Sequence, residues 1–407
     1  MCIKTIIMYS IPAYGHVYST LALMEGLTTA GYTVIYYSLD PFRESVEAKG
    51  CCFRSYALDA AAIDLTDGKR LPRLYRLLLE HTAGMLPQLL KEAGEQAPAG
   101  IIFDSLALWG RAVGELLAVP HFSFYSIAAI DRVFSESFFR YSVGFPAECF
   151  RHIGELPEAL RLRRYLKKRY GIRHLGMLRV LMNRGDYNLM GFSRRMQPGG
   201  KRLGKKYLFL GSLSPHRNRF AEPETGPRTS VPLIYISLGT IFNENEKFFQ
   251  MVAEQLGNQD VQVIIAARLS AELQHKLPAN FIAEPFVDQP AVLKQADLFI
   301  SAGGMNSIHE ALFYGVPCLL CPQQGEQHLN AGQLRRQGFC LILKDPRQLG
   351  VMAKQAMGLK DTWPQKVRAE MTKTRLKRAV QVIQYETGKV NNGHEKSISD
   401  RGDRVPG

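Results

Sequence analysis

The chain has 407 residues and is 46% hydrophobic, a length that allows two domains with separate cores and a composition typical of a soluble globular protein. Its seven cysteines form no CxxC pair and no Cys/His set at zinc spacing, which argues against a zinc module and predicts reduced packing residues. The net charge of +14 is concentrated in residues 151–206, where many lysines and arginines stand against three acidic residues.

The first half of the chain alternates predicted strands and helices. Residues 3–9 are apolar and β-branched, which indicates a buried strand. This opening run is too short to span a membrane and lacks a signal-peptide cleavage site, so we expect a cytoplasmic protein. The patterns that follow predict helix 16–30, strand 33–38, helix 74–93, strand 100–103, helix 107–118 and strand 121–125. Such alternation is typical of a parallel, doubly wound sheet.

A polar, proline-rich segment then separates this half from a second series of strands and helices. The second series predicts strands at 233–238, 261–266, near 281, 297–300 and 317–321, with helices at 246–256, 289–295, 306–314 and 327–337. The fold class predicted is therefore α/β, with two Rossmann-like domains facing each other across a cleft.

These patterns divide the chain into five parts. Residues 1–213 are expected to form the first domain, 214–231 the linker and 232–360 the second domain. Residues 361–387 are helical and basic in pattern, and the tail 388–407 is polar enough to predict disorder.

Two residues at the ends of predicted strands suggest acid–base chemistry. His16 follows the first strand and its loop, and Asp104 follows strand 100–103. In open α/β sheets ligands bind beyond the carboxyl ends of the strands. A carboxylate bonded to one ring nitrogen raises the basicity of the other, so the pair would form a general-base dyad. Taken singly, each residue could instead be a helix cap or a satisfied loop residue.

A glycine pair and a Glu-Gln pair suggest a site for a nucleotide diphosphate joined to a polyhydroxyl group. The amides of Gly303 and Gly304 can approach an anion, and Asn306 and Ser307 open the following helix, whose N-terminus favours negative charge. About twenty residues later, Glu326-Gln327 offers partners for sugar hydroxyls, although a solvated helix start would look the same.

This region resembles the sugar-donor signature of family 1 glycosyltransferases, with its spacing intact. The matching residues are Phe286 to Gln289, Ala302 to Glu310, and Pro322 with Glu326 and Gln327. The segments around His16 and Asp104 resemble the family's catalytic segments, and the macrolide-type bacterial enzymes are the most similar group. The resemblance implies a GT-B fold with a last helix that crosses back to the first domain. It also implies a UDP-hexose donor, most often UDP-glucose, with no metal and no cofactor.

The resemblance also implies roles for the donor residues. Phe286 would stack on the pyrimidine, the backbone of Val287 would read its edge, and Gln289 would lie near the ribose. Glu310 would accept hydrogen bonds from the ribose, and Thr240 would help to stabilise the leaving group. The alternatives are that Phe286 and Val287 are core residues, and that Ser307 and Glu310 form a capping box.

The function predicted is an inverting transfer of a hexose, with His16 as base, to a small hydrophobic acceptor such as a macrolide, flavonoid or other phenol. Ala302 stands where the family usually has a diphosphate-contacting histidine, so a nucleotide-sugar-binding protein of degenerate activity is one alternative. A lipid acceptor at a membrane met by residues 151–206 is another. Nicotinamide and NTPase motifs are absent, a nucleic-acid partner is disfavoured, and both a monomer and a dimer remain open.

Overall fold

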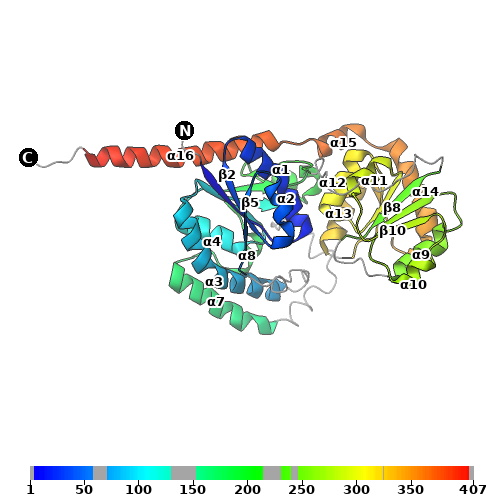
Figure 1. Cartoon of the computed structure of the whole chain (residues 1–407), viewed down its shortest axis with the longest axis horizontal. Helices are drawn as coiled ribbons and strands as arrows, with labels where there is room; N and C mark the ends of the chain where they lie inside the picture. The colour runs from blue at the N-terminus through cyan, green and yellow to red at the C-terminus, as the bar shows by residue number, and fades with distance from the viewer. Residues whose placement is uncertain are drawn as a thin grey trace, which may run out of the picture.

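The protein consists of two α/β domains that lie side by side (Figure 1). The computed structural model describes residues 4–57, 71–129, 153–213, 231–239, 246–323 and 325–402. The two parallel sheets and their order along the chain confirm the predicted fold class.

The first domain contains a seven-stranded parallel sheet. Its strands are, in spatial order, β3 (Cys52–Ser55), β2 (Thr33–Ser38), β1 (Thr5–Tyr9), β4 (Gly100–Asp104), β5 (His121–Tyr125), β6 (Tyr187–Met190) and β7 (Tyr207–Phe209). Its helices are α1 (Tyr14–Thr29), α2 (Arg43–Glu47), α3 (Leu71–Gln96), α4 (Leu108–Leu117), α7 (Leu156–Tyr170) and α8 (Met177–Met182), with short 3₁₀ turns η1 (Asp40–Phe42), η3 (Ile153–Glu155), η4 (Arg194–Met196) and η5 (Gly200–Arg202).

Both faces of this sheet are covered, which explains why its central strands are apolar throughout. Along β1, Ile7 and Tyr9 belong to one buried cluster, and Ile6 and Met8 belong to the cluster on the opposite face. Successive side chains of a strand point to opposite faces, so a strand between two cores needs apolar residues at every position.

The second domain repeats this plan with a six-stranded parallel sheet. In spatial order the strands are β10 (Phe281–Glu284), β9 (Gln262–Ala266), β8 (Leu233–Ser237), β11 (Leu298–Ser301), β12 (Cys318–Leu320) and β13 (Cys340–Ile342). The helices are α9 (Glu246–Leu256), α10 (Ala271–His275), α11 (Gln289–Gln295), α12 (Met305–Tyr314), α13 (Gly325–Arg336), α14 (Leu349–Met357), α15 (Gln365–Thr372) and α16 (Leu376–Gly402), with turns η6 (Pro346–Gln348) and η7 (Gly358–Thr362).

The C-terminal region contains two helices where the sequence predicted one. Residues 361–387 contain parts of two helices: α15 packs against α12 in the second domain, and α16 packs against α1 in the first. Ala379 and Ile383 of α16 are buried in the core of the first domain. Helix α16 extends beyond residue 388 to Gly402. The chain thus crosses back to the first domain through α16 (Figure 1).

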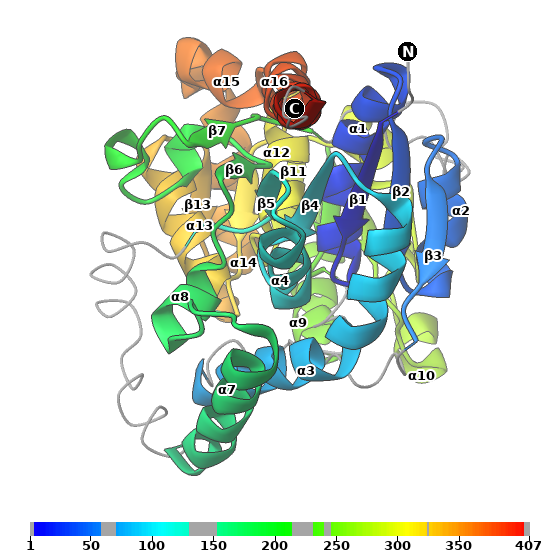
Figure 2. The same cartoon turned by 90° about the vertical axis from the view of Figure 1, so that its left-hand side faces the viewer.

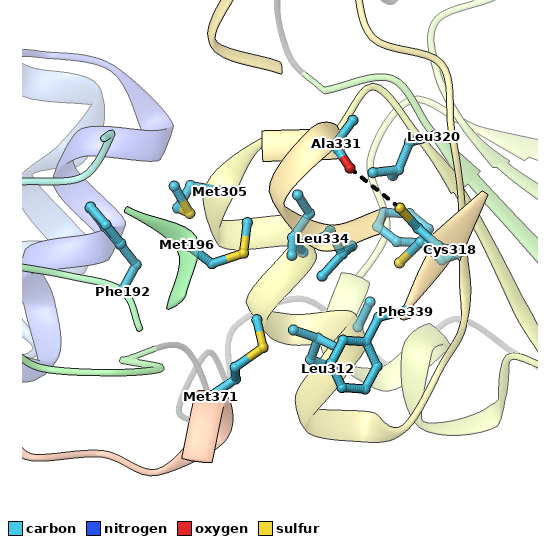
Figure 3. Close-up of a cluster of buried hydrophobic side chains, with 14 of the residues drawn as sticks. Phe192, Met196, Met305, Leu312, Cys318, Leu320, Ala331, Leu334, Phe339 and Met371 are labelled. Carbon is cyan, nitrogen blue, oxygen red and sulfur yellow. Dashed lines mark hydrogen bonds between the residues drawn. The ribbon is translucent and has the colours of Figure 1, made fainter. Parts of the chain in front are cut away.

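The two domains share a hydrophobic cluster where they meet (Figure 3). Phe192 and Met196 come from the segment that follows β6, and they belong to the same buried cluster as Met305 and Leu334 of the second domain. A buried hydrogen bond joins the domains beside it, because the backbone N–H of Ser193 donates to Nε2 of His309 at 3.1 Å. This apolar contact holds the carboxyl ends of the two sheets toward each other.

Among the described residues, no helix is both long enough and apolar enough to cross a membrane.

Candidate active site

His16 and Asp104 meet at the carboxyl ends of β1 and β4, as the sequence predicted. Helix α1 begins at Tyr14, so His16 lies in its first turn rather than at a cap. Asp104 is the last residue of β4 and is fully buried. Its Oδ2 lies 2.7 Å from Nδ1 of His16, and its Oδ1 accepts a hydrogen bond from the backbone N–H of Leu106 at 2.8 Å. The alternative role of Asp104 as a cap fails, because the N-cap of α4 is Ala107.

Ser126 is a third member of this cluster that the sequence analysis did not identify. It follows β5, and its hydroxyl lies 3.1 Å from the same Nδ1 of His16. With Asp104 ionised, Nδ1 carries the proton and Nε2 keeps a free lone pair. None of the described residues forms a hydrogen bond with Nε2. Since Ser126 follows the strand next to β4, the strand-end rule could have found it.

The surroundings of His16 favour a basic ring. Burial alone would lower its pKa, but the charge and hydrogen bond of Asp104 outweigh burial and raise the pKa of His16 above its usual value. The carboxylate of Glu326 adds to this increase. Glu326 belongs to the second domain. The side chain of Asn306 in the same domain donates to the carbonyl of Gly15, next to His16, so residues of the donor motif lie near the dyad.

Glu326 lies in the first turn of α13 and is held by Asn330 one turn later. The amide of Asn330 donates to Oε1 of Glu326 at 3.0 Å and to the carbonyl of Gly303 at 3.1 Å. Burial raises the pKa of Glu326, while Asn330 and His16 act in the opposite direction. Asn330 therefore links the Glu-Gln pair to the glycine pair, a link that only tertiary structure reveals.

The glycine pair leads directly into α12, which begins at Met305, one residue earlier than predicted. Gly303 has a φ of +90°, a conformation that residues with a Cβ rarely adopt, and a Cβ added at Gly304 would meet nothing within 4 Å. The amide of Gly303 donates to the hydroxyl of Ser301 at 3.3 Å. The helix N-terminus and open space at Gly304 suit an anion such as a diphosphate.

The predicted ribose residues form one hydrogen-bonded group. The amide of Gln289 donates to Oε2 of Glu310 and to the hydroxyl of Ser307, the latter at 3.4 Å. Glu310 is only 1% exposed, so its carboxylate faces Gln289 rather than solvent. The capping-box alternative is wrong, because the N-cap of α12 is Gly304 and no side chain caps the helix.

Phe286 and Val287 differ in exposure. Phe286 is 55% exposed, which excludes the core alternative for its ring. The guanidinium of Arg268 lies 5.4 Å from the ring centroid, a cation–π contact that the sequence analysis did not identify. Val287 is partly buried against the shared cluster, so the core alternative describes its side chain and leaves only its backbone for a ligand.

Three predicted residues remain: Gln327, Ala302 and Thr240. Gln327 is next to Glu326 in α13, and its Oε1 accepts a hydrogen bond from the backbone N–H of Gln323 at 2.8 Å. Ala302 is buried at 2% exposure directly before the glycine pair. Thr240 lies outside the described residues.

Comparison with known proteins identifies the family of the chain. Residues 238–384 match the model of the glycosyltransferase family 28 C-terminal domain. The NDP-glycosyltransferase YjiC of Bacillus subtilis (strain 168) is 30% identical over 360 residues, which cover 83% of each chain. The chain belongs to the macrolide-type family 1 glycosyltransferases. The uncharacterized UDP-glucosyltransferase YdhE, from the same strain of Bacillus subtilis, is also similar to this chain. The two are 27% identical over 81% of this chain and 83% of YdhE.

A solved structure confirms the GT-B fold of the glycosyltransferase. The calicheamicin glycosyltransferase CalG4 superposes with a TM-score of 0.77 at 19% identity, covering 96% of this chain and all of its own. At this identity the likeness shows the fold alone. The two-domain plan predicted from the sequence is therefore that of known glycosyltransferases.

Proposed function

We propose that the protein is an inverting glycosyltransferase that moves a hexose, with glucose as the expected sugar, from a UDP-sugar to a hydroxyl of a small hydrophobic natural product or phenol. The observation that carries this proposal is the contact of 2.7 Å between His16 and Asp104, placed where the donor motif of the second domain approaches. Family membership supports a glycosyl transfer, and the relative YdhE is named a UDP-glucosyltransferase.

In the proposed reaction, Nε2 of His16 takes the proton of the acceptor hydroxyl while Asp104 stabilises the resulting imidazolium. The acceptor oxygen attacks the anomeric carbon as the bond to the diphosphate oxygen breaks, and the bonding pair leaves with the nucleoside diphosphate. Attack from the opposite face turns an α-linked donor into a β-glycoside. Each step uses groups that this chain supplies, and the proposed reaction requires no metal or cofactor.

The second domain would bind the donor through the groups described above. The N-terminus of α12, the amide of Gly304 and the side chain of Asn306 would stabilise charge on the diphosphate. Phe286 would stack on the base, Gln289 would reach the ribose, and Glu326 with Gln327 would bind sugar hydroxyls. Glu310 would act through Gln289, because its carboxylate is buried against that amide.

The test is incubation of the pure protein with UDP-glucose and a panel of macrolides, flavonoids and simple phenols. We expect UDP release that depends on the acceptor, and a β-glucoside identified from its anomeric proton by NMR. An α-linked product would contradict inversion. No product and no UDP release across a broad panel of donors and acceptors would contradict transfer and favour a protein that binds nucleotide sugars.

A further inference from the structure

Helix α7 presents a basic face with no packing partner among the described residues. One side of α7 packs on α3 through the buried residues Ala159 and Leu166. The opposite side carries Arg161, Tyr165 and Lys168, which lie at helical spacing and are exposed. A helix that uses only one side for packing leaves this other side available to a partner.

The charge of this region is strongly one-sided. Eight arginines and lysines occur between residues 153 and 179 against two glutamates. Glu155 bonds to Arg76, and Glu158 pairs with Arg161 at 3.6 Å, so both acidic groups already have basic partners. The basic residues are Arg161, Arg163, Arg164, Lys167, Lys168, Arg169, Arg173 and Arg179. An anionic surface would meet little repulsion here.

Large apolar side chains lie exposed among these charges. A helix face that only contacts water would normally carry polar side chains at such positions. Tyr165 is 47% exposed and Leu178, at the start of α8, is 55% exposed. Three more residues of the same region are exposed: Ile153, Leu160 and Met177. Basic residues interleaved with aromatic and aliphatic side chains are typical of a protein surface that lies on a lipid bilayer.

We propose that this lipid-facing surface, formed by Ile153, Leu160, Met177 and the exposed residues of α7 and α8 named above, docks the protein on an anionic membrane. The basic groups would bind lipid headgroups, and the apolar side chains would enter the interface between headgroups and acyl chains. A single-stranded nucleic acid would instead need aromatic platforms for successive bases, whereas most of the exposed apolar residues here are aliphatic.

The lipid-facing surface connects directly to the dyad. Figure 2 shows α7 at the lower edge of the first domain, with α8 above it. The hydroxyl of Tyr125, at the end of β5, donates to the carbonyl of Met182, the last residue of α8. Asn183 follows, and its amide lies 3.5 Å from the carbonyl oxygen of Asp104. On docking, the membrane would therefore lie against α8, and α8 is followed directly by the residue that contacts Asp104.

The test measures binding of the full chain to vesicles and does not depend on any transferase activity. Cosedimentation is compared for vesicles of phosphatidylcholine alone and vesicles with roughly one-third phosphatidylglycerol, at low and high salt. We expect binding only with the anionic lipid and at low salt. The double variant Arg164→Glu/Lys168→Glu should lower the partition coefficient at least about tenfold. The matched control Lys354→Glu/Lys360→Glu, with the same change in charge on the second domain, should bind like the wild type.

A second variant separates a lipid surface from a general polyanion site. Tyr165→Ser/Leu178→Ser keeps every charge and changes only exposed side chains, so we expect a folded protein, verified by its melting temperature, whose binding is about tenfold weaker. Absence of sedimentation with anionic vesicles would overturn the proposal. Wild-type vesicle binding by this apolar variant, combined with displacement by polyuridylate, would overturn it in favour of a nucleic-acid site.

Discussion

The side-chain amide of Asn306 donates a hydrogen bond of 2.8 Å to the carbonyl oxygen of Gly15. Asn306 lies in the first turn of α12, within the donor motif, and Gly15 directly precedes the proposed catalytic base. One bond thus joins the N-terminus of α12 in one domain to the His16 segment of the other. Together with the shared cluster around Met196 and Met305, it holds the two parts of the candidate site close together.

The dependence of activity on pH should report the influence of Asp104 on His16. The base must be neutral, so kcat/KM should fall as the pH falls through the pKa of His16, which lies above the usual 6.5. In Asp104→Asn the carboxylate that raises this pKa is lost while burial remains. We therefore expect the acid limb to move to lower pH, with a plateau reduced about 10²- to 10⁴-fold. An acid limb at the wild-type pH in this variant would contradict the proposed pairing.

Restoring the family histidine should raise the activity with UDP-glucose. Ala302→His would place a hydrogen-bond donor beside the proposed diphosphate site, where a charge-assisted hydrogen bond contributes about 1.5–3 kcal/mol. We expect a rise of about tenfold in kcat/KM for UDP-glucose. Ala302→Phe, which adds a ring without a donor, is the control and should give no rise. Equal losses in both variants would show that the site lacks room for a ring, and activity only in the histidine variant would identify the natural protein as a binder.

Phe286 should contribute to nucleotide affinity rather than to chemistry. Stacking of an aromatic ring on a base contributes about 1–3 kcal/mol, so Phe286→Ala should raise the Kd for UDP about tenfold or more. Phe286→Trp should restore binding. The control is Phe313→Ala, which removes an exposed ring near the opposite end of α12 and should leave the Kd unchanged. Calorimetric titration with UDP measures all four proteins, and equal affinity in the wild type and Phe286→Ala would exclude stacking.

Protonation of His309 should destabilise the folded protein. Burial lowers the pKa of His309 from 6.5 to about 4, so between these values the unfolded state binds the proton more readily than the folded state. The contribution is fully present above pH 6.5 and is lost as the pH falls toward 4, by about 3 kcal/mol in total. In urea unfolding, we expect the free energy of unfolding to decrease less between pH 6.5 and pH 4 for His309→Gln than for the wild type. Identical pH dependence in both proteins would contradict this assignment.

Much of the fold could be predicted because its central strands lie between two cores. The strands β1, β4, β8 and β11 place apolar side chains on both faces of their sheets, so their sequences are continuous apolar runs that are easy to recognise. The edge strands β3, β7 and β13, and β6 next to the edge, were not predicted. They contain only three or four residues each, too few for a clear periodic pattern, and sheet pairing determines their conformation.

The meeting of His16 and Asp104 could be predicted, because each is a residue type suited to acid–base chemistry that follows a recognisable strand. Contacts that depend on tertiary packing were not. The burial of Glu310 results from its bond to Gln289, and the position of Arg268 over Phe286 joins two loops. Asn330 was missed because its bonds to Glu326 and Gly303 connect two elements whose relative placement no local pattern specifies.

The most direct test of the central claim is the turnover of His16→Ala, measured as UDP release from UDP-glucose in the presence of a phenol. We expect a loss of about 10²- to 10⁴-fold, with the Kd for UDP-glucose unchanged, because the imidazole acts on the acceptor and not on donor binding. His275→Ala, which alters a histidine of α10 in the second domain, should keep wild-type turnover. Wild-type turnover in His16→Ala would contradict the account.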